Sequence, residues 1–261
     1  MLRSLYTAAT GMDAQQTRLD VIANNLANAS TTGFKSSRAD FEDLLSETIR
    51  SSTTPTAQGG GRPEALQVGL GVQTATTTRS FAQGDLTQTQ NPLDLAIQGT
   101  GFFRIQRSNG DFAYTRAGNF RTDATGRIVT QTGEIVEPGL TIPPDATSVT
   151  VRADGTVLVS EPSRTTPTEL GNLQLALFTN PGGLDALGNN LFGASAASGE
   201  PLLVKPGDQG SGSVSQGYLE NANVQAVQEM VNMITTQRAY EMNSKVIEAA
   251  DQMLQKLSQL R

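Results

Sequence analysis

The chain has 261 residues, of which 37% are hydrophobic and 5% aromatic, and it contains neither cysteine nor histidine. These absences exclude disulfides, thiolate chemistry, the usual zinc sites and imidazole acid–base catalysis, so we expect no metal, no cofactor and no catalytic residue. The net charge of −6 argues against nucleic acid or anionic lipid as a partner. No apolar run approaches the roughly 20 residues of a membrane span.

The first 26 residues carry an apolar stripe whose members follow one another at spacings of three and four. This pattern predicts an amphipathic helix over about residues 3–28, within an N-terminal segment of residues 1–35. Three asparagines near its end, Asn24, Asn25 and Asn28, are poor helix formers. The stripe consists of Leu2, Leu5, Ala9, Met12, Gln16, Leu19, Ala23 and Leu26.

Residues 36–91 are predicted to be a linker region. Within it, residues 36–50 carry apolar side chains at helical spacing, and Ser37 with Asp40 can form a capping box at the start of a helix. The low-complexity tract that follows, SSTTPTAQGGG, favours an extended conformation instead. Both conformations stay open for this segment.

The middle of the chain alternates short β-runs with turn sequences such as Ser-Asn-Gly-Asp, Ala-Thr-Gly and Pro-Gly-Gly. This pattern predicts a small antiparallel β-domain over residues 92–205, followed by a linker over residues 206–221. The strand-like runs are residues 101–106, 112–116, 119–123, 127–131, 149–153, 156–160 and 173–178.

A second amphipathic helix is predicted over about residues 222–259. Asn221 or Asn223 can cap its start, where the helix dipole also favours the negative charges of Glu220 and Glu229. Its apolar stripe shifts register over residues 235–243, as at a coiled-coil stutter. The stripe consists of Val227, Val231, Ile234, Val246, Ala250, Met253, Leu257 and Leu260.

Together these elements predict an α+β protein. The helices of the terminal segments, residues 1–35 and 222–261, are expected to pack as a coiled coil, with the antiparallel β-domain between them in the sequence. Such a helix pair leaves its outer apolar faces unburied, and burial against further copies is the natural remedy. Positive and negative residues nearly balance in both segments, so copies would not repel one another strongly.

Two other classes of protein stay open from the residues alone. A carboxylate-dependent enzyme would need a deep pocket with two convergent carboxylates, and the acidic residues of the middle region fall at turns instead. A soluble coiled-coil module that binds a partner helix would remain a small oligomer at high concentration. An assembly subunit would lengthen into a polymer under the same conditions.

Four stretches of the sequence are distinctive in combination. They are VIANNLANASTTGFK (21–35), LDLAIQGTGFF (93–103), YTRAGNF (114–120) and QGYLENANV (216–224). With these motifs, the chain resembles the rod and hook family of bacterial flagellar axial proteins over almost its whole length. In its length and in the tract from Ile49 to Val72, the chain resembles the distal-rod members of this family. A proximal rod or hook subunit is the alternative.

The resemblance implies a structural subunit that self-assembles into a straight, rigid, hollow helical drive shaft, which transmits torque from motor to hook. It implies a place in the basal body, where the distal rod crosses the periplasm, and export through the type III apparatus without a cleaved signal peptide. The implied partners are further copies of the chain, the proximal rod proteins, the hook protein, the rod cap and the surrounding periplasmic and outer-membrane ring proteins. The terminal helices would form the inner layer.

The asparagines acquire a role in that setting. The amides of Asn24, Asn25, Asn28 and Asn243 can exchange hydrogen bonds between neighbouring helices and fix their register, as a buried asparagine does in a coiled coil. Apolar contacts alone would allow the helices to slide. We therefore predict that these amides fix the register of the two apolar stripes. We call the two stripes together the assembly seam.

Overall fold

The computed structural model describes residues 2–50, 65–162, 164, 166–208 and 210–259. The chain divides into two compact units. Unit 1 consists of residues 1–26, 37–78 and 225–261, and unit 2 consists of residues 27–36 and 79–224. Each unit is therefore assembled from segments that are distant in the sequence.

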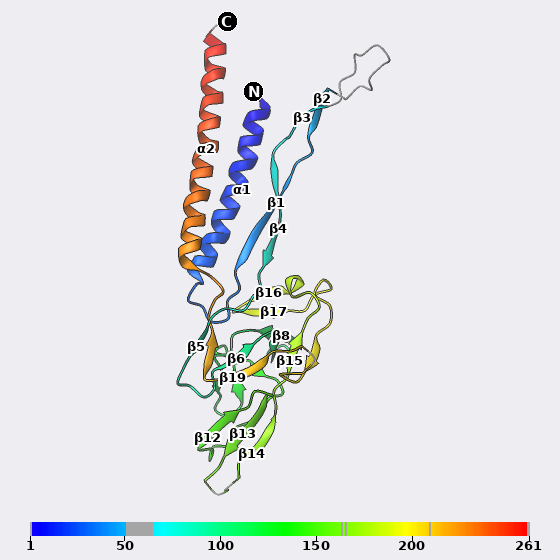
Figure 1. Cartoon of the computed structure of the whole chain (residues 1–261), viewed down its shortest axis with the longest axis vertical. Helices are drawn as coiled ribbons and strands as arrows, with labels where there is room; N and C mark the ends of the chain where they lie inside the picture. Colours follow the sequence, from blue (N-terminus) through cyan, green and yellow to red (C-terminus); the bar gives the residue numbers. More distant parts are fainter. Residues whose placement is uncertain (1, 51–64, 163, 165, 209, 260–261) are drawn as a thin grey trace, which may run out of the picture. The chain divides into compact units, whose positions relative to one another are not determined.

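Unit 1 contains the two long helices, α1 (Leu2–Ala27) and α2 (Ala226–Gln259). They run side by side in opposite directions (Figure 1). The missing side chain of Gly11 permits their close approach, because a Cβ atom there would lie 2.9 Å from Asn243 Nδ2. The α+β class and the packing of the terminal helices against each other are confirmed. Both helices lie close to their predicted bounds.

Two pairs of strands form the rest of unit 1, and we call them together the ribbon. Residues 51–64, which lie in the sequence between the second and the third of these strands, are outside the described part of the chain. The helical alternative for residues 36–50 is wrong, because this segment pairs with a second strand instead. Asp40, the expected partner in a capping box, accepts a hydrogen bond from the Thr78 hydroxyl across the ribbon. The pairs are β1 (Ser37–Asp43) with β4 (Val72–Arg79), and β2 (Glu47–Arg50) with β3 (Leu66–Val68).

Hydrogen bonds tie the ribbon to α1 at separate points along the helix. Asn25 Nδ2 donates to the carbonyl oxygen of Ser37 over 2.8 Å, and the N–H of Ser37 donates to Asn25 Oδ1 over 2.9 Å. Further along α1, the hydroxyl of Thr10 accepts the N–H of Val72 over 3.4 Å. Because Asn25 is also almost fully buried, its amide is used within its own chain.

Unit 2 is built around a nine-stranded antiparallel sheet. Its main path has the order β16-β17-β8-β7-β11-β10-β9, and β15 joins β7 to β18. Strand β7 pairs with three others and lies at the centre of the sheet. The strands are β7 (Phe102–Gln106), β8 (Phe112–Thr115), β9 (Arg121–Thr122), β10 (Ile128–Val129), β11 (Ile135–Val136), β15 (Leu175–Leu177), β16 (Asp185–Gly188), β17 (Leu191–Gly193) and β18 (Leu202–Val204).

Three smaller sheets complete unit 2, with the orders β12-β13-β14, β19-β6 and β20-β5. Each of the seven predicted β-runs contains an observed strand. Residues 206–221, predicted as a linker, contain β19 and β20. The strands are β5 (Leu86–Gln88), β6 (Leu95–Gln98), β12 (Ser148–Val151), β13 (Thr156–Ser160), β14 (Thr168–Asn172), β19 (Ser213–Gln216) and β20 (Tyr218–Glu220).

The two faces of β7 separate two hydrophobic clusters. Phe103 and Ile105 belong to the larger cluster and Phe102 to the smaller one, as the alternation of side chains along a strand requires. The smaller cluster is aromatic, with the Phe102 ring centroid 5.8 Å from that of Phe178 and 6.2 Å from that of Phe192 in edge-to-face contact. A chain with few aromatic residues thus gathers several of them in one core.

Gly118, in the turn after β8, has no room for a side chain. A Cβ atom there would lie 1.6 Å from the carbonyl oxygen of Leu95, which is fixed backbone. We expect Gly118→Ala to lower the free energy of unfolding by about 3 kcal/mol, at the upper end of the cost of overpacking. Gly69→Ala is the control, because no atom lies within 4 Å of the added Cβ. Urea denaturation measures both, and equal stabilities would contradict the packing.

Candidate functional site

Three charged side chains, Lys35, Arg116 and Glu220, are buried together inside unit 2. Their exposed fractions are 1%, 4% and 0%. Charged side chains are almost never fully buried unless they are paired, so this group, called here the ion cluster, needs a specific explanation. It is the most constrained polar arrangement that we find in the described part of unit 2.

The carboxylate of Glu220 stands at the centre of the ion cluster. Its Oε1 atom lies 2.5 Å from Lys35 Nζ and accepts the N–H of Gly84 over 2.9 Å. Lys35 Nζ also donates to the carbonyl oxygen of Ala82 over 2.7 Å. Arg116 Nη1 lies 3.6 Å from Glu220 Oε2. Hydrogen bonds to fixed backbone groups thus hold both members of the shorter ion pair.

The charges of the ion cluster do not balance, because two cations share one carboxylate. Burial lowers the pKa of Lys35 below its usual value, against the attraction of Glu220, and the nearby charge of Arg116 lowers it further. Burial likewise lowers the pKa of Arg116, while Glu220 opposes the change. The guanidinium offsets part of this cost by donating from Nη2 to the carbonyl oxygen of Gly99 over 2.6 Å.

The ion cluster brings together all four distinctive stretches of the sequence. Lys35 ends the first stretch, Gly99 lies in the second, Arg116 in the third and Glu220 in the fourth. The charged residues of these motifs were not predicted to form a site, because charged side chains are expected at the surface. The sequence did carry one signal for the ion cluster. Three of the four motifs contain one of its members, with a positive charge in two of them and a negative charge in the third.

Asn223 extends the ion cluster by bridging two backbone segments, at residue 36 and at residues 80–82. Its Oδ1 atom accepts the N–H of Ser36 over 2.7 Å, and Nδ2 donates to the carbonyl oxygens of Ser80 and Ala82 over 2.9 and 3.1 Å. The prediction that Asn223 caps α2 is therefore wrong.

Two other predictions for the start of α2 are also wrong, whereas the prediction that Glu229 lies near this helix terminus is confirmed. Asn221 donates to the hydroxyl of Thr87, and Glu220 lies in the ion cluster instead of near the helix terminus. The physical reason is that α2 begins only at Ala226, after β20 has ended the β-structure at Glu220.

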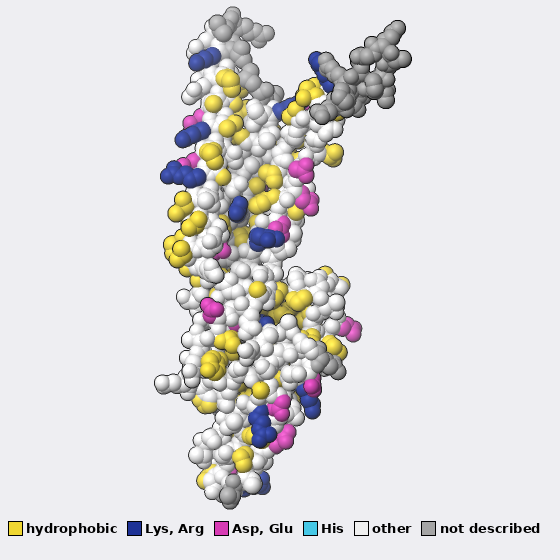
Figure 2. Space-filling view, in the orientation of Figure 1, with side chains coloured by type: hydrophobic (Ala, Val, Ile, Leu, Met, Phe, Trp, Pro, Cys, Tyr) yellow, Lys and Arg dark blue, Asp and Glu magenta, His cyan; other side chains and the backbone are white. Residues whose placement is uncertain are grey.

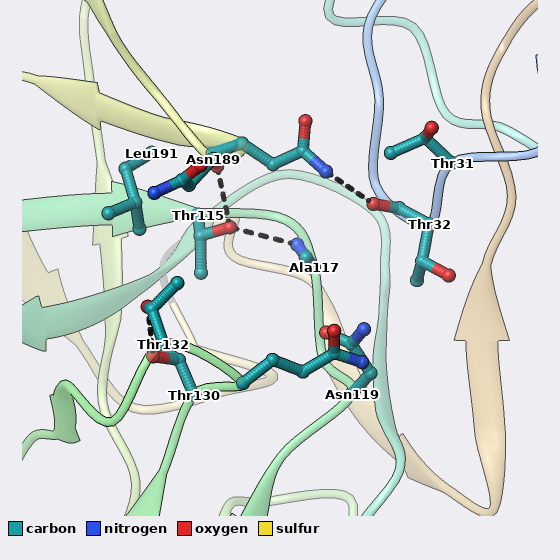
Figure 3. Close-up of a pocket in the computed structure, with 11 residues that line it drawn as sticks. Thr31, Thr32, Thr115, Ala117, Asn119, Thr130, Thr132, Asn189 and Leu191 are labelled. Atoms are coloured by element: carbon teal, nitrogen blue, oxygen red, sulfur yellow. Dashed lines mark hydrogen bonds between the residues drawn. The ribbon is translucent and has the colours of Figure 1, made fainter. Parts of the chain in front are cut away.

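The pocket shown in Figure 3 is polar but carries no charge. It has a volume of about 410 Å³, and none of the eleven residues that line it has a carboxylate. The hydroxyl of Thr115 donates to the carbonyl oxygen of Asn190 over 2.8 Å, and Asn190 Nδ2 donates to that of Thr32 over 3.0 Å. The pocket does not offer the paired acids of a carboxylate-dependent enzyme. Its hydrogen bonds hold the segment after α1 against the sheet of unit 2.

The assembly seam lies mostly on the outer side of the helix pair. Within α2, one seam residue, Ala250, is buried, whereas Val227, Ile234 and others are exposed; Figure 2 shows hydrophobic side chains along this helix. The exposed seam residues of α2 are Val227, Val231, Ile234, Val246 and Met253. Leu260 and the side chains of Leu2 and Leu257 lie outside the described part of the chain.

The expectation that the two stripes bury against each other is therefore wrong for most of α2. In α1, Ala9, Gln16 and Ala23 are exposed, while Leu5, Met12, Leu19 and Leu26 are half-buried. The fully buried residues of the two helices are mostly small ones. They are Ala8, Ala14, Ile22 and Asn25 in α1, and Thr236 and Ala250 in α2. Small side chains allow close helix approach, which leaves the larger apolar residues outside.

The four amides occupy different environments. Asn25 is bonded to the ribbon, Asn243 lies against Gly11, and Asn28 Oδ1 accepts the hydroxyl of Thr31 over 3.3 Å. Asn24 is exposed. That these amides fix the register between copies stays a prediction.

The fold is that of a two-part assembly protein, in which terminal helices with exposed apolar side chains are joined to a β-rich unit. No helix in the described part of the chain combines the length and apolarity needed to cross a membrane. Three family descriptions match the chain: "Flagella basal body rod protein" over residues 5–35, "Flagellar hook protein FlgE/F/G D1 domain" over 96–159, and "Flagellar basal body rod FlgEFG protein C-terminal" over 215–260. Each matched region contains one member of the ion cluster.

Similar proteins match along the whole chain. The flagellar basal-body rod protein FlgG of Caulobacter vibrioides is 51% identical over 261 residues, and that of Bacillus subtilis is 41% identical over 266, with 100% of both chains covered in each case. The flagellar hook protein FlgE of Helicobacter mustelae is 46% identical over 52% of this chain and 30% of its own length. The chain belongs to the FlgG family of flagellar basal-body rod proteins.

Removing the carboxylate of the ion cluster should cost more than removing one cation. Glu220→Gln leaves two buried cations without a counter-charge, so we expect a loss of about 3–5 kcal/mol in the free energy of unfolding. In Lys35→Met, Glu220 keeps Arg116 and the carbonyl of Ala82 keeps the hydrogen bond from Asn223, so the expected loss is only about 1–2 kcal/mol. Chemical denaturation followed by circular dichroism measures both. The opposite order would contradict the charge imbalance.

Lys35 should also make stability depend on pH. Its lowered pKa in the folded chain means that the unfolded chain binds more protons between that value and 10.5, so the free energy of unfolding contributed by Lys35 rises with pH in this window. The difference between the parent chain and Lys35→Met isolates this effect from Tyr114, whose raised pKa acts in the opposite sense. Denaturation from neutral pH to pH 10.5 measures it, and a constant difference would refute the prediction.

Proposed function

We propose that the chain is the subunit of the distal rod and that it polymerises through its terminal helices into a straight, rigid, hollow helical shaft, which transmits torque from motor to hook. The exposed apolar face of α2 is the observation that carries the proposal. Val227 has 75% of its surface exposed and Ile234 has 57%. A monomer gains nothing by exposing such a stripe, whereas burial against further copies removes it from water.

The distribution of buried and exposed residues supports assembly through unit 1 and an independent fold for unit 2. Unit 2 encloses two hydrophobic clusters of its own, so its fold does not depend on the apolar side chains of α2. Unit 1, in contrast, has few fully buried side chains and a ribbon that is largely exposed on β2, β3 and β4. Isolated two-stranded ribbons are only marginally stable in water. Neighbouring copies are the natural source of the missing contacts.

Length supports the distal rod over the hook. The FlgG relatives are matched over 97–100% of their own length, whereas the FlgE relative is matched over 30%. The tract from Ile49 to Val72, which distinguishes the distal rod in the resemblance, begins within β2 and contains β3, with which β2 pairs. Contacts made by this tract in a second radial layer would prevent protofilaments from sliding and would keep the shaft straight.

The remaining partners follow from this position in the flagellum. We propose that the subunit is exported through the type III apparatus without a cleaved signal peptide and assembles beneath the rod cap. The polymer would join the proximal rod proteins at one end and the hook protein at the other, inside the surrounding ring proteins. A structural role of this kind requires no catalytic residue, and the relatives named above are rod and hook proteins.

Electron microscopy of the concentrated protein tests the proposal. We expect straight hollow tubes from the parent chain, whereas a coiled-coil module would remain a small oligomer. Ile234→Asp should abolish tubes, because a charge would be buried between copies, while changing the free energy of unfolding by less than about 1 kcal/mol. Leu202→Asp is the matched control, since Leu202 in unit 2 is also 57% exposed.

Two results would overturn the proposal. One is a parent chain that stays a defined small oligomer at every concentration. The other is an Ile234→Asp variant that forms tubes as readily as Leu202→Asp, because the exposed face of α2 would then not be the assembly surface.

A further inference from the structure

Arg79, the last residue of β4, differs from the other described arginines that lack an ion pair. Within the described residues, its guanidinium forms neither an ion pair nor a hydrogen bond, although the side chain is half-buried. The others in this part of the chain are all exposed, namely Arg18, Arg50, Arg121 and Arg152. A charged side chain that leaves water without a partner loses hydration, so Arg79 requires a specific explanation.

The guanidinium of Arg79 lies on the aromatic core of unit 2. Its Cζ atom is 5.2 Å from the ring centroid of Phe192, and that ring is in edge-to-face contact with Phe81 at 5.3 Å. The ring attracts the cation and offsets part of the lost hydration. Burial nevertheless lowers the pKa of Arg79, and no carboxylate opposes this change as Glu220 does for Arg116. The charge of Arg79 is thus only partly compensated within its own chain.

We propose that Arg79 binds a carboxylate of a second copy of the chain in the polymer. The inference rests on the proposed function, because it names a contact within that assembly. A contact with a ring provides no acceptor for the N–H donors of a guanidinium, and a carboxylate can accept two of them in parallel. A hydroxyl or a backbone carbonyl would accept a hydrogen bond but would leave the charge uncompensated.

The chain itself supplies carboxylates for this contact. Its acidic residues outnumber its basic residues by 25 to 19. In the ribbon, Glu42 and Asp43 follow each other on β1, both are exposed, and neither forms an ion pair with any described residue. Contacts in a helical polymer join different surfaces of neighbouring copies. A cation on unit 2 of one copy can therefore meet an acidic residue from another part of the next copy.

The environment of Arg79 makes such a pair stronger than an ordinary surface ion pair. Exposed pairs contribute little, because both side chains remain hydrated. Around Arg79, half-burial and the ring of Phe192 already exclude part of the water, which strengthens the attraction to a carboxylate. Losing one member of a desolvated pair at an interface weakens binding more than losing a charge at its rim.

Arg79→Gln should therefore raise the protein concentration needed for tube formation at least tenfold. Arg121→Gln is the matched control, since Arg121 is exposed on β9 and lies over no aromatic ring of a described residue. We expect its effect to stay within twofold. Electron microscopy of a dilution series measures both, and equal concentrations for the two variants would contradict the inference. Near-ultraviolet circular dichroism of the aromatic core monitors the folding of unit 2.

A carbodiimide cross-link identifies the partner of Arg79 directly. The reagent joins an amine to a neighbouring carboxylate as an amide and takes up the water that is lost, whereas a guanidinium forms no such product. Arg79→Lys therefore introduces a reactive group and keeps the positive charge, so it decides the question even if Arg79→Gln disturbs unit 2. The variant is assembled as a minority with parent chain that carries a heavy nitrogen isotope. Mass spectrometry then separates cross-links within one copy from those between copies.

We expect cross-links between position 79 of the variant and an acidic peptide of the labelled parent chain. Their yield should exceed that of the matched Arg121→Lys variant at least tenfold. Tubes that lack these cross-links, or that show them only within one copy, would overturn the inference and leave the proposed function standing. A parent chain that forms no tubes would overturn the proposed function and the inference with it, so the two failures are distinguishable.

Discussion

The buried contact between Lys35 and Glu220 is the constraint on which the rest of the structure depends. An ammonium group inside a β-rich core is tolerable only if a carboxylate and a backbone carbonyl reach it from other segments, and here these come from residues 220 and 82. Arg116 adds a second cation that must find backbone acceptors at Ile97 and Gly99. Four separate motifs therefore have to be in place at once, which explains why they are distinctive together.

This arrangement separates the stability of the single chain from its capacity to assemble. Unit 2 pairs Lys35 with Glu220 at the ion cluster and fills its own core around β7. The helix pair instead uses Gly11, Ala14 and Ala250 for contacts inside the chain and leaves larger apolar side chains exposed. Assembly contacts need not supply any interaction that unit 2 requires for its own fold.

Periodicity predicted much of the fold, because it reports which elements have an apolar face. Both helices and the strands β7, β8 and β15 were predicted from the sequence, whereas β11, which also pairs with β7, was not. The strand pairing of the ribbon was not predicted from the sequence. Strand β4 reads VQTATTTR, which has no alternation of apolar residues, and its place in the fold is determined by its pairing with β1. The ion cluster was missed for a different reason: a local sequence pattern cannot show that a charged residue at position 35 meets another 185 positions away.

The assembly seam shows a further limit of prediction from periodicity. A stripe at spacings of three and four states that one helix face is apolar, but not whether the same chain or another copy covers it. In α2 the same chain covers Ala250 and leaves Val231 and Ile234 exposed. Under the proposed function, further copies cover the side chains that this chain leaves exposed. The buried ion pair and the exposed stripe of α2 then serve different levels of structure, the first within unit 2 and the second between subunits.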